Sequence, residues 1–263
     1  MTVGAPTILY GHERAGCAVN PPLSPKQRMG EGGKAPFAAW TERPLRAPSG
    51  FSRNERPHME IDPSDHTGRQ NYQLLSGMVV PRPIAFVTSL SADGLLNAAP
   101  YAYFNAIANK PPLVMFSPTY QGAERPGYSG EKVKKDTVRN IEETGEFVVN
   151  IATEDIAEAI NLCAESYGPE INELEEAGLT TLPSRVVKPP RVAESSGALE
   201  CRLERFIELG SHRLVIGQVV MFHLRDDLYV DGTVDVERLR PIARLSKNNY
   251  TRCGDIFEML RPK

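Results

Sequence analysis

The chain has 263 residues, of which 41% are hydrophobic and 24% charged, a composition typical of a soluble, folded protein. It contains no run of about 18 apolar residues and no basic segment followed by an apolar stretch near its N-terminus, so we expect no membrane span, no secretory signal and a cytoplasmic location. A formal net charge of −3 gives no sign of a clustered basic face, so we expect small-molecule ligands and no nucleic acid partner.

Residues 1–58 differ in composition from the rest of the chain. They hold eight of the 22 prolines, eight Lys or Arg residues against four Asp or Glu residues, and few branched aliphatic residues. Such a segment buries too little apolar surface to fold, so we expect a disordered tail over residues 1–58 and a folded domain over residues 59–263. Because Met59 follows the tail directly, both Met1 and Met59 stay open as the natural start.

The folded part is expected to be mainly β. Segment 83–90 has the composition of a strand, a turn follows it, and segment 95–101 returns antiparallel to it. Segments 113–117 and 146–151 are typical of buried strands, and apolar alternation predicts two longer antiparallel strands. The alternating residues are Leu199, Cys201, Leu203 and Ile207 in one strand and Leu214, Ile216, Val220 and Phe222 in the other. Six strands suffice for a small barrel, so we expect an α+β fold on a six-stranded antiparallel β-barrel.

Three helices are expected beside the strands. They cover 137–144, 154–165 and 171–177, and a glycine that can end the helix follows the first and the third. One face of the second helix carries Ile156, Ile160, Cys163 and Ala164. We expect these helices to cover the ends of the barrel. The turn-rich segment 119–130 is expected to form a mobile loop that could act as a lid.

Motifs for hydrolytic or metal chemistry are absent from the sequence. It has no G-x-S-x-G nucleophile elbow, no H-E-x-x-H, no P-loop and no G-x-G-x-x-G after a strand. The four cysteines lie far apart without zinc spacing, so we interpret them as reduced thiols, with Cys163 and Cys201 as small core residues. We therefore expect no metal site.

Polar residues stand at strand ends where alternation would place apolar ones. The main cases are Thr88, Ser89, Asn97 and Asn105. An isoalloxazine ring has carbonyls and ring nitrogens that pair with amide donors, and an apolar face that packs on proline or aromatic side chains. Segment 97–105 supplies both kinds of group, although strand-end asparagines often only cap turns.

A second polar group lies at the start of the helix predicted over 137–144. It consists of Lys134, Lys135, Thr137 and Arg139. Unpaired backbone N–H groups, the helix dipole and cations together favour a phosphate at such a position. The alternative is an ordinary helix start with Asp136 as its cap and a solvated lysine. A mononucleotide could span this helix start and segment 97–105.

These residues belong to an ordered set of motifs that resembles a known family. The motifs are Arg82-Pro83-Ile84-Ala85, segment 97–105, Pro111-Pro112, Lys135-Asp136-Thr137-Val138-Arg139-Asn140-Ile141, Glu146-Phe147-Val148-Val149-Asn150-Ile151, and Gly210-Ser211-His212 with Ile216-Gly217-Gln218-Val219. They follow in the order seen in flavin reductase-like proteins of the FMN-binding split-barrel superfamily. The resemblance covers residues 70–258 and implies a split barrel and a flavin more specifically than it implies an electron acceptor.

The resemblance also implies where FMN would lie. Its ring and ribityl chain would lie near Thr88, Ser89, Asn97, Ala99, Pro100, Tyr101 and Asn105, and its phosphate near Lys135, Thr137 and Arg139. Arg82, which stands between two prolines, is a further candidate contact for flavin or nicotinamide. The family is usually homodimeric, with the flavin close to the subunit interface.

His212 is the candidate catalytic residue. It matches the histidine of the family's G-D-H motif, which lies near the flavin and the nicotinamide site, but the motif here is Gly-Ser-His. Loss of the aspartate removes a partner that would hold the imidazole. The alternative is that His212 is an exposed turn residue before a strand.

The resemblance implies an NAD(P)H-dependent flavin reductase that holds FMN, with FAD as the alternative flavin and NADH or NADPH as a transient co-substrate. Electrons would pass to free flavin, a partner monooxygenase or another small acceptor. Three rivals stay open: a small-molecule oxidase on the same fold, an FMN electron carrier without NAD(P)H activity, and an interaction protein with an empty barrel. Resemblance in fold does not choose among them.

Overall fold

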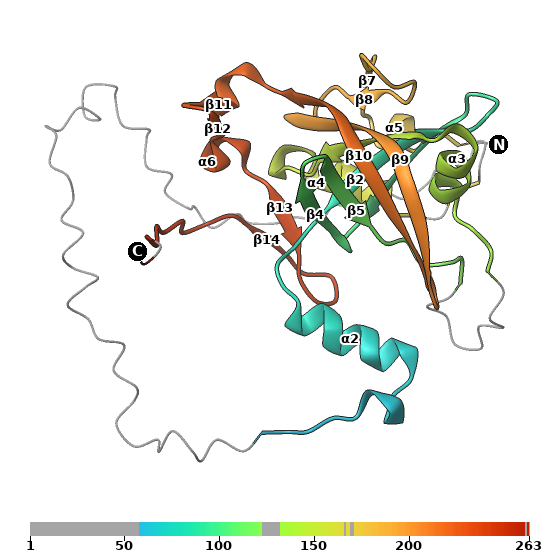
Figure 1. The fold of residues 1–263 in the computed structure, drawn as a ribbon, viewed down its shortest axis with the longest axis vertical. Helices are drawn as coiled ribbons and strands as arrows, with labels where there is room; N and C mark the ends of the chain where they lie inside the picture. The colour runs from blue at the N-terminus through green and yellow to red at the C-terminus, as the bar shows by residue number, and fades with distance from the viewer. Residues whose placement is uncertain (1–57, 123–131, 166, 169–170, 261, 263) are drawn as a thin grey trace, which may run out of the picture. The chain divides into compact units, whose positions relative to one another are not determined.

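The computed structural model describes residues 58–122, 132–165, 167–168, 171–260 and 262. The tail expected over residues 1–58 lies outside the described residues except for its last residue, and so do residues 123–130 of the loop expected over 119–130. Residues Ile61–Lys263 form one unit, and Figure 1 labels most of its strands and helices. No helix in the described ranges is long and apolar enough to cross a membrane.

An antiparallel sheet of seven strands forms the centre of this unit, in the order β3-β2-β6-β9-β10-β5-β4. The strands are β2 (Ala85–Leu90), β3 (Leu96–Tyr101), β4 (Phe104–Asn109), β5 (Pro112–Phe116), β6 (Glu146–Ile151), β9 (Gly197–Leu209) and β10 (His212–Leu224). The mainly β character is as expected, but the expected count of six strands is wrong. The missed strand is β4, whose residues are nearly all exposed, so it lacks the alternation that marks a half-buried strand.

Strands β9 and β10 form the longest pair of the sheet, with 13 residues each (Figure 1). The predicted buried face of β10 is wrong. The structure buries Val215, Gly217 and Val219, whereas Leu214, Ile216 and Val220 are only partly buried and Phe222 is 64% exposed. Both sets are largely apolar, so alternation alone could not decide which of them faces the core.

The apolar core lies on both faces of β2. One cluster includes Phe116, Phe147 and Val215 and receives Ile141 from α3 (Asp136–Thr144). The other cluster includes Phe86 and is covered by residues of α4 (Ala157–Leu162) and α5 (Glu173–Glu176). Because both of its faces are buried, β2 is apolar throughout except for two polar residues near its end.

The predicted helices form with shorter or divided bounds. Helix α3 ends at Gly145, whose φ of 71° is the left-handed conformation that glycine adopts easily, as expected. The helix expected over 154–165 is divided into a 3-10 turn, η3 (Glu154–Ile156), and α4, and Ala164 is exposed rather than on the buried face. Helix α3 packs against β2 and β3, and helices α4 and α5 pack against β3.

Several short elements have no counterpart in the sequence prediction. Helix α2 (Gly68–Met78) begins with a capping box between Thr67 and Gln70. A second sheet joins β1 (Arg82–Pro83), β13 (Ile242–Arg244) and β14 (Tyr250–Arg252). The remaining elements are η2 (Pro63–Asp65), β7 (Thr181–Leu182), β8 (Arg191–Val192), η4 (Asp226–Leu228), β11 (Tyr229–Val230), β12 (Thr233–Val234) and α6 (Val236–Leu239).

Replacement of Gly217 by alanine should destabilise the fold. A Cβ at this position would lie 2.3 Å from Cζ and 2.8 Å from Cε1 of Phe147, whose ring is fully buried and cannot move into solvent. We expect Gly217→Ala to lower the free energy of unfolding by about 1–3 kcal/mol, as overpacked cores do, measured by urea denaturation. Gly254→Ala is the control, because its Cβ would meet nothing within 4 Å. Equal stability of the two variants would contradict the packing described.

Candidate functional site

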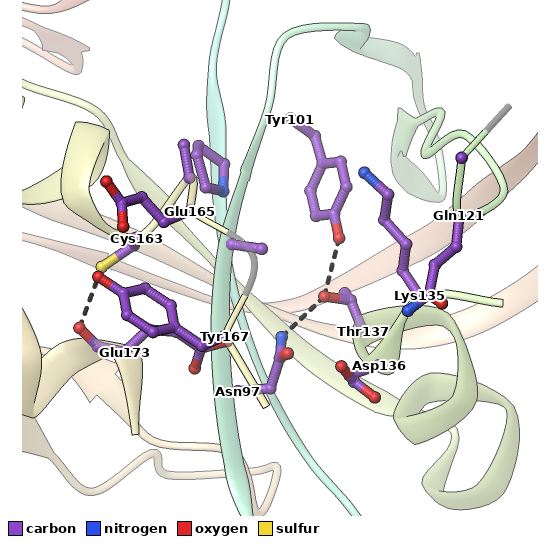
Figure 2. Close-up of a pocket in the computed structure, with 14 residues that line it drawn as sticks. Asn97, Tyr101, Gln121, Lys135, Asp136, Thr137, Cys163, Glu165, Tyr167 and Glu173 are labelled. Carbon is purple, nitrogen blue, oxygen red and sulfur yellow. Dashed lines mark hydrogen bonds between the residues drawn. The ribbon is translucent and has the colours of Figure 1, made fainter. Parts of the chain in front are cut away.

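A cavity of about 310 Å³ lies where the edge strand β3 meets the start of α3 and the segment that leads into α5. Figure 2 shows its side chains, with the β3 residues between those of α3 and those of segment 163–173. The lining residues are Asn97, Ala99, Pro100, Tyr101, Gln121, Gly122, Lys135, Asp136, Thr137, Cys163, Ala164, Glu165, Tyr167 and Glu173. The cavity therefore brings together four stretches that are far apart in the sequence.

The hydroxyl of Thr137 connects α3 to β3. Tyr101 Oη donates to Thr137 Oγ1 at 2.9 Å, and the side-chain amide of Asn97 lies 2.8 Å from the same oxygen (Figure 2). Burial raises the pKa of Tyr101 to about 12, so its phenol stays protonated and remains a donor near neutral pH. This network fixes the polar side of the cavity.

The start of α3 is suited to an anion. Lys135 is the N-cap residue of the helix, and its side chain forms no capping hydrogen bond. The first backbone N–H groups of the helix carry the positive end of the helix dipole, and the Lys135 side chain lines the same cavity. The Lys135 side chain and the N-terminus of α3 together form a site of the type that binds phosphate in proteins.

Half of the predicted site residues meet in this cavity. Those that line it are Asn97, Ala99, Pro100, Tyr101, Lys135 and Thr137. They include the central part of the predicted ring contacts and two of the three predicted phosphate contacts. The structure therefore brings the two polar groups of the sequence together as expected.

Thr88 and Ser89 are placed elsewhere. Both are fully buried in β2. Thr88 Oγ1 donates to the carbonyl of Pro190 at 2.6 Å, and Ser89 Oγ accepts from the Asn140 amide at 3.2 Å. Each hydroxyl thus satisfies a polar group of the fold, and neither lines the cavity.

Asn105 and Arg139 also lie outside the cavity. Asn105 is exposed on β4, where its side-chain oxygen accepts from the backbone N–H of Ala106 at 2.9 Å. Arg139 forms an ion pair with Asp136 and lines a neighbouring hollow with Asn97. Its guanidinium also donates to the Lys134 carbonyl at 3.2 Å.

Arg82 has a structural duty that its sequence position did not reveal. Its guanidinium donates to the carbonyls of Ser76 at 2.7 Å, Val79 at 2.8 Å and Leu245 at 2.9 Å. The side chain is buried and joins the end of α2 to the segment between β13 and β14. Its donors serve the fold rather than the cavity.

His212 lies at the start of β10, outside the cavity lining. Its ring stacks on Tyr103 with centroids 5.6 Å apart and an interplanar angle of 19°. Its Nδ1 lies 2.9 Å from Ser211 Oγ, so the serine that replaces the family's aspartate meets the imidazole. The residue is half-buried. Its catalytic role stays a prediction.

Sequence reasoning missed the acidic wall of the cavity. Glu173 accepts from the Ala98 backbone N–H at 3.0 Å, and burial raises the pKa of its carboxyl. Cys163 is buried, as expected, and donates its thiol to the carbonyl of Glu173 at 3.3 Å. Burial raises the pKa of this thiol to about 11, so it is not a reactive thiolate. No motif marked either residue, because only the fold brings them to β3.

Residues 77–238 match the family model of the flavin reductase like domain. The chain belongs to the flavin reductase-like family. Among solved structures, this family member is similar to nitrilotriacetate monooxygenase component B from Bacillus cereus, with 41% identity, a TM-score of 0.73 and coverage of 78% of this chain and 100% of the other.

Two further solved structures are similar to this chain. The 2-nitrobenzoate 2-nitroreductase of Pseudomonas fluorescens is 35% identical, with a TM-score of 0.68 over 78% of this chain and 96% of the other. A Shewanella frigidimarina protein with a split barrel domain is 19% identical, with a TM-score of 0.64 over 76% of this chain and 96% of the other. The last similarity concerns the fold alone and matches the mainly β architecture described above.

Arg82→Met should loosen α2 without removing a charge from the cavity. The variant leaves three carbonyls without their charged donor, and such bonds contribute about 1.5–3 kcal/mol each. We expect backbone hydrogen exchange of residues 68–78 to become at least about tenfold faster. Arg185→Met, at an exposed arginine, is the control. Unchanged exchange in α2 would show that Arg82 does not hold the helix.

Proposed function

We propose that this chain binds FMN in the cavity between β3 and α3 and works as an NAD(P)H-dependent flavin reductase. The proposal rests on one observation: segment 97–101 of β3 and the start of α3, with Lys135 as its N-cap residue and Asp136 after it, line the same cavity. One end of that cavity suits a ring and the other suits a phosphate. FAD is the alternative flavin.

The residues present fit such a ligand. Ala99 and Pro100 offer apolar surface from β3, and Asn97 and Tyr101 offer polar atoms beside it. Lys135 and the first N–H groups of α3 supply cation and donors for a phosphate. The cavity lining thus contains the three kinds of contact that a mononucleotide flavin requires.

When bound, FMN would supply the redox chemistry by accepting a hydride from a nicotinamide and passing electrons onward. The protein's part is to hold and orient. Thr137 would fix the edge strand against the helix, and Lys135 would hold the phosphate. Because the sequence has no dinucleotide fingerprint, we propose that NADH or NADPH binds only transiently.

A partner monooxygenase or free flavin is the acceptor we favour. The support is the similarity to component B of nitrilotriacetate monooxygenase, at 41% identity over the whole of that chain. We also propose a homodimer with the flavin close to the interface. Exposed apolar side chains on β4 and β9, namely Ile107, Ile207 and Leu209, support an interface there. Asn105 and His212 would then be available to the partner's flavin.

Anaerobic stopped-flow absorbance tests the proposed activity. The purified chain, reconstituted with FMN, is mixed with NADH and, separately, with NADPH. We expect the visible flavin band to bleach rapidly with at least one donor, and the faster donor is the preferred one. Bound flavin that stays oxidised with both donors would contradict the reductase and support a carrier or an oxidase. Failure to bind any flavin would contradict the whole proposal.

Lys135→Gln should weaken binding of FMN but not of riboflavin. The variant removes the cation from the proposed phosphate site and leaves the strand residues in place. Loss of a charge-assisted contact corresponds to an increase of about 10-fold or more in the Kd for FMN. The matched control is Lys188→Gln, at an exposed lysine outside the cavity. If affinity for FMN and for riboflavin fell equally, Lys135 would not act through the phosphate, and the proposed phosphate site would be wrong.

A further inference from the structure

We propose that Glu173 is a positioning residue, which fixes the direction of the hydrogen bonds that run from Tyr101 through Thr137 to Asn97 and so makes Asn97 a donor toward the bound flavin. The inference rests on the proposed function, because it requires a flavin in this cavity. Glu173 belongs to none of the motifs identified in the sequence.

The side-chain amide of Asn97 has two possible orientations. With its nitrogen toward Thr137, the amide oxygen faces the Glu173 carboxylate, and two acceptors oppose each other. Turned the other way, Nδ2 donates to Glu173 Oε1 at 3.2 Å and Oδ1 accepts from Thr137 Oγ1 at 2.8 Å. The second orientation satisfies both neighbours, so the carboxylate selects it.

That orientation gives the whole network one direction. The phenol of Tyr101 donates to Thr137 Oγ1, the Thr137 hydroxyl donates to Asn97 Oδ1, and Asn97 donates to Glu173. An ionised carboxylate can only accept, so it is the natural end of such a chain. Hydrogen bonds that point the same way strengthen one another in a buried site.

One N–H of Asn97 is left over for a ligand. An amide NH₂ has two hydrogens, and Glu173 takes one of them. Asn97 lines the cavity, and the ring carbonyls of a flavin are acceptors. If the amide were free to turn, its oxygen would oppose those carbonyls for part of the time. Glu173 therefore contributes to flavin affinity by fixing Asn97, with no contact of its own required.

Glu173 is itself held in place. Its Oε2 accepts from the Ala98 N–H at 3.0 Å, which anchors the carboxylate to the edge strand. Burial raises the pKa of its carboxyl, so protonation begins at a higher pH than for an ordinary glutamate. A protonated carboxyl becomes a donor and no longer fixes the amide. The other titratable groups facing this part of the cavity are Tyr101, Lys135, Asp136, Cys163, Glu165 and Tyr167.

The experiment compares flavin affinity in Glu173→Gln and in the unchanged chain, by quenching of flavin fluorescence across the acidic to neutral pH range. Riboflavin is the main probe, because it has no phosphate to titrate. We expect Glu173→Gln to raise the Kd for riboflavin and for FMN by about 5–10-fold at neutral pH. The affinity of the unchanged chain for riboflavin should fall as the pH is lowered through the raised pKa of Glu173. The Glu173→Gln variant should lack this pH-dependent loss of affinity.

Two controls separate positioning from general damage. Glu176→Gln, at an exposed glutamate of the same helix, should keep the affinity and pH profile of the unchanged chain. In an Asn97→Ala background, Glu173→Gln should have no further effect, because the residue on which it acts is gone. If Glu173→Gln fails to fold, the Asn97 side-chain amide signals of the unchanged chain, followed by NMR, should titrate with the Glu173 carboxyl.

The outcomes distinguish this inference from the proposed function. An unchanged chain that binds no flavin overturns both. An unchanged chain that binds flavin, with the same or tighter affinity and the same pH profile in Glu173→Gln, overturns the role of Glu173 alone. Effects of Glu173→Gln that persist fully without the Asn97 side chain also overturn it.

Discussion

The candidate site depends on one buried contact, the Thr137 hydroxyl between α3 and β3. Thr137 is 1% exposed, and both Tyr101 and Asn97 reach its oxygen. A neutral hydrogen bond contributes only about 0.5–1.5 kcal/mol net, but a buried hydroxyl without a partner costs about 1–3 kcal/mol. The helix start is therefore held at a fixed place beside the edge strand, and the cavity follows from that placement.

The fold was predictable where burial leaves a regular pattern. Helix α3 could be placed because a glycine follows it, and β6 because its centre, Phe147 to Val149, is apolar. Strand β4 could not, since its exposed residues show no period, and the core face of β10 could not, since both faces carry apolar residues. Position 217 faces the core as a glycine, because the Phe147 ring occupies the space that a side chain there would need.

The site was predictable only in part, for a different physical reason. Buried polar residues must find partners, and a sequence does not show whether the partner is a ligand or the chain itself. Asn97 and Lys135 line the cavity, whereas Thr88 bonds Pro190 and Arg82 bonds three distant carbonyls. Glu173 is the opposite case, a residue with no sequence signal that becomes part of the site through its contact with β3.

We propose that one cavity holds the flavin ring on β3 and the flavin phosphate at the start of α3. A crystal structure of the chain with FMN would show both positions at once. We predict the ring against Ala99 and Pro100, a ring carbonyl within hydrogen-bonding distance of the Asn97 amide, and the phosphate at the N–H groups of Asp136 and Thr137 with Lys135 beside it. FMN bound with its phosphate away from the start of α3, or at another surface of the chain, would contradict the account.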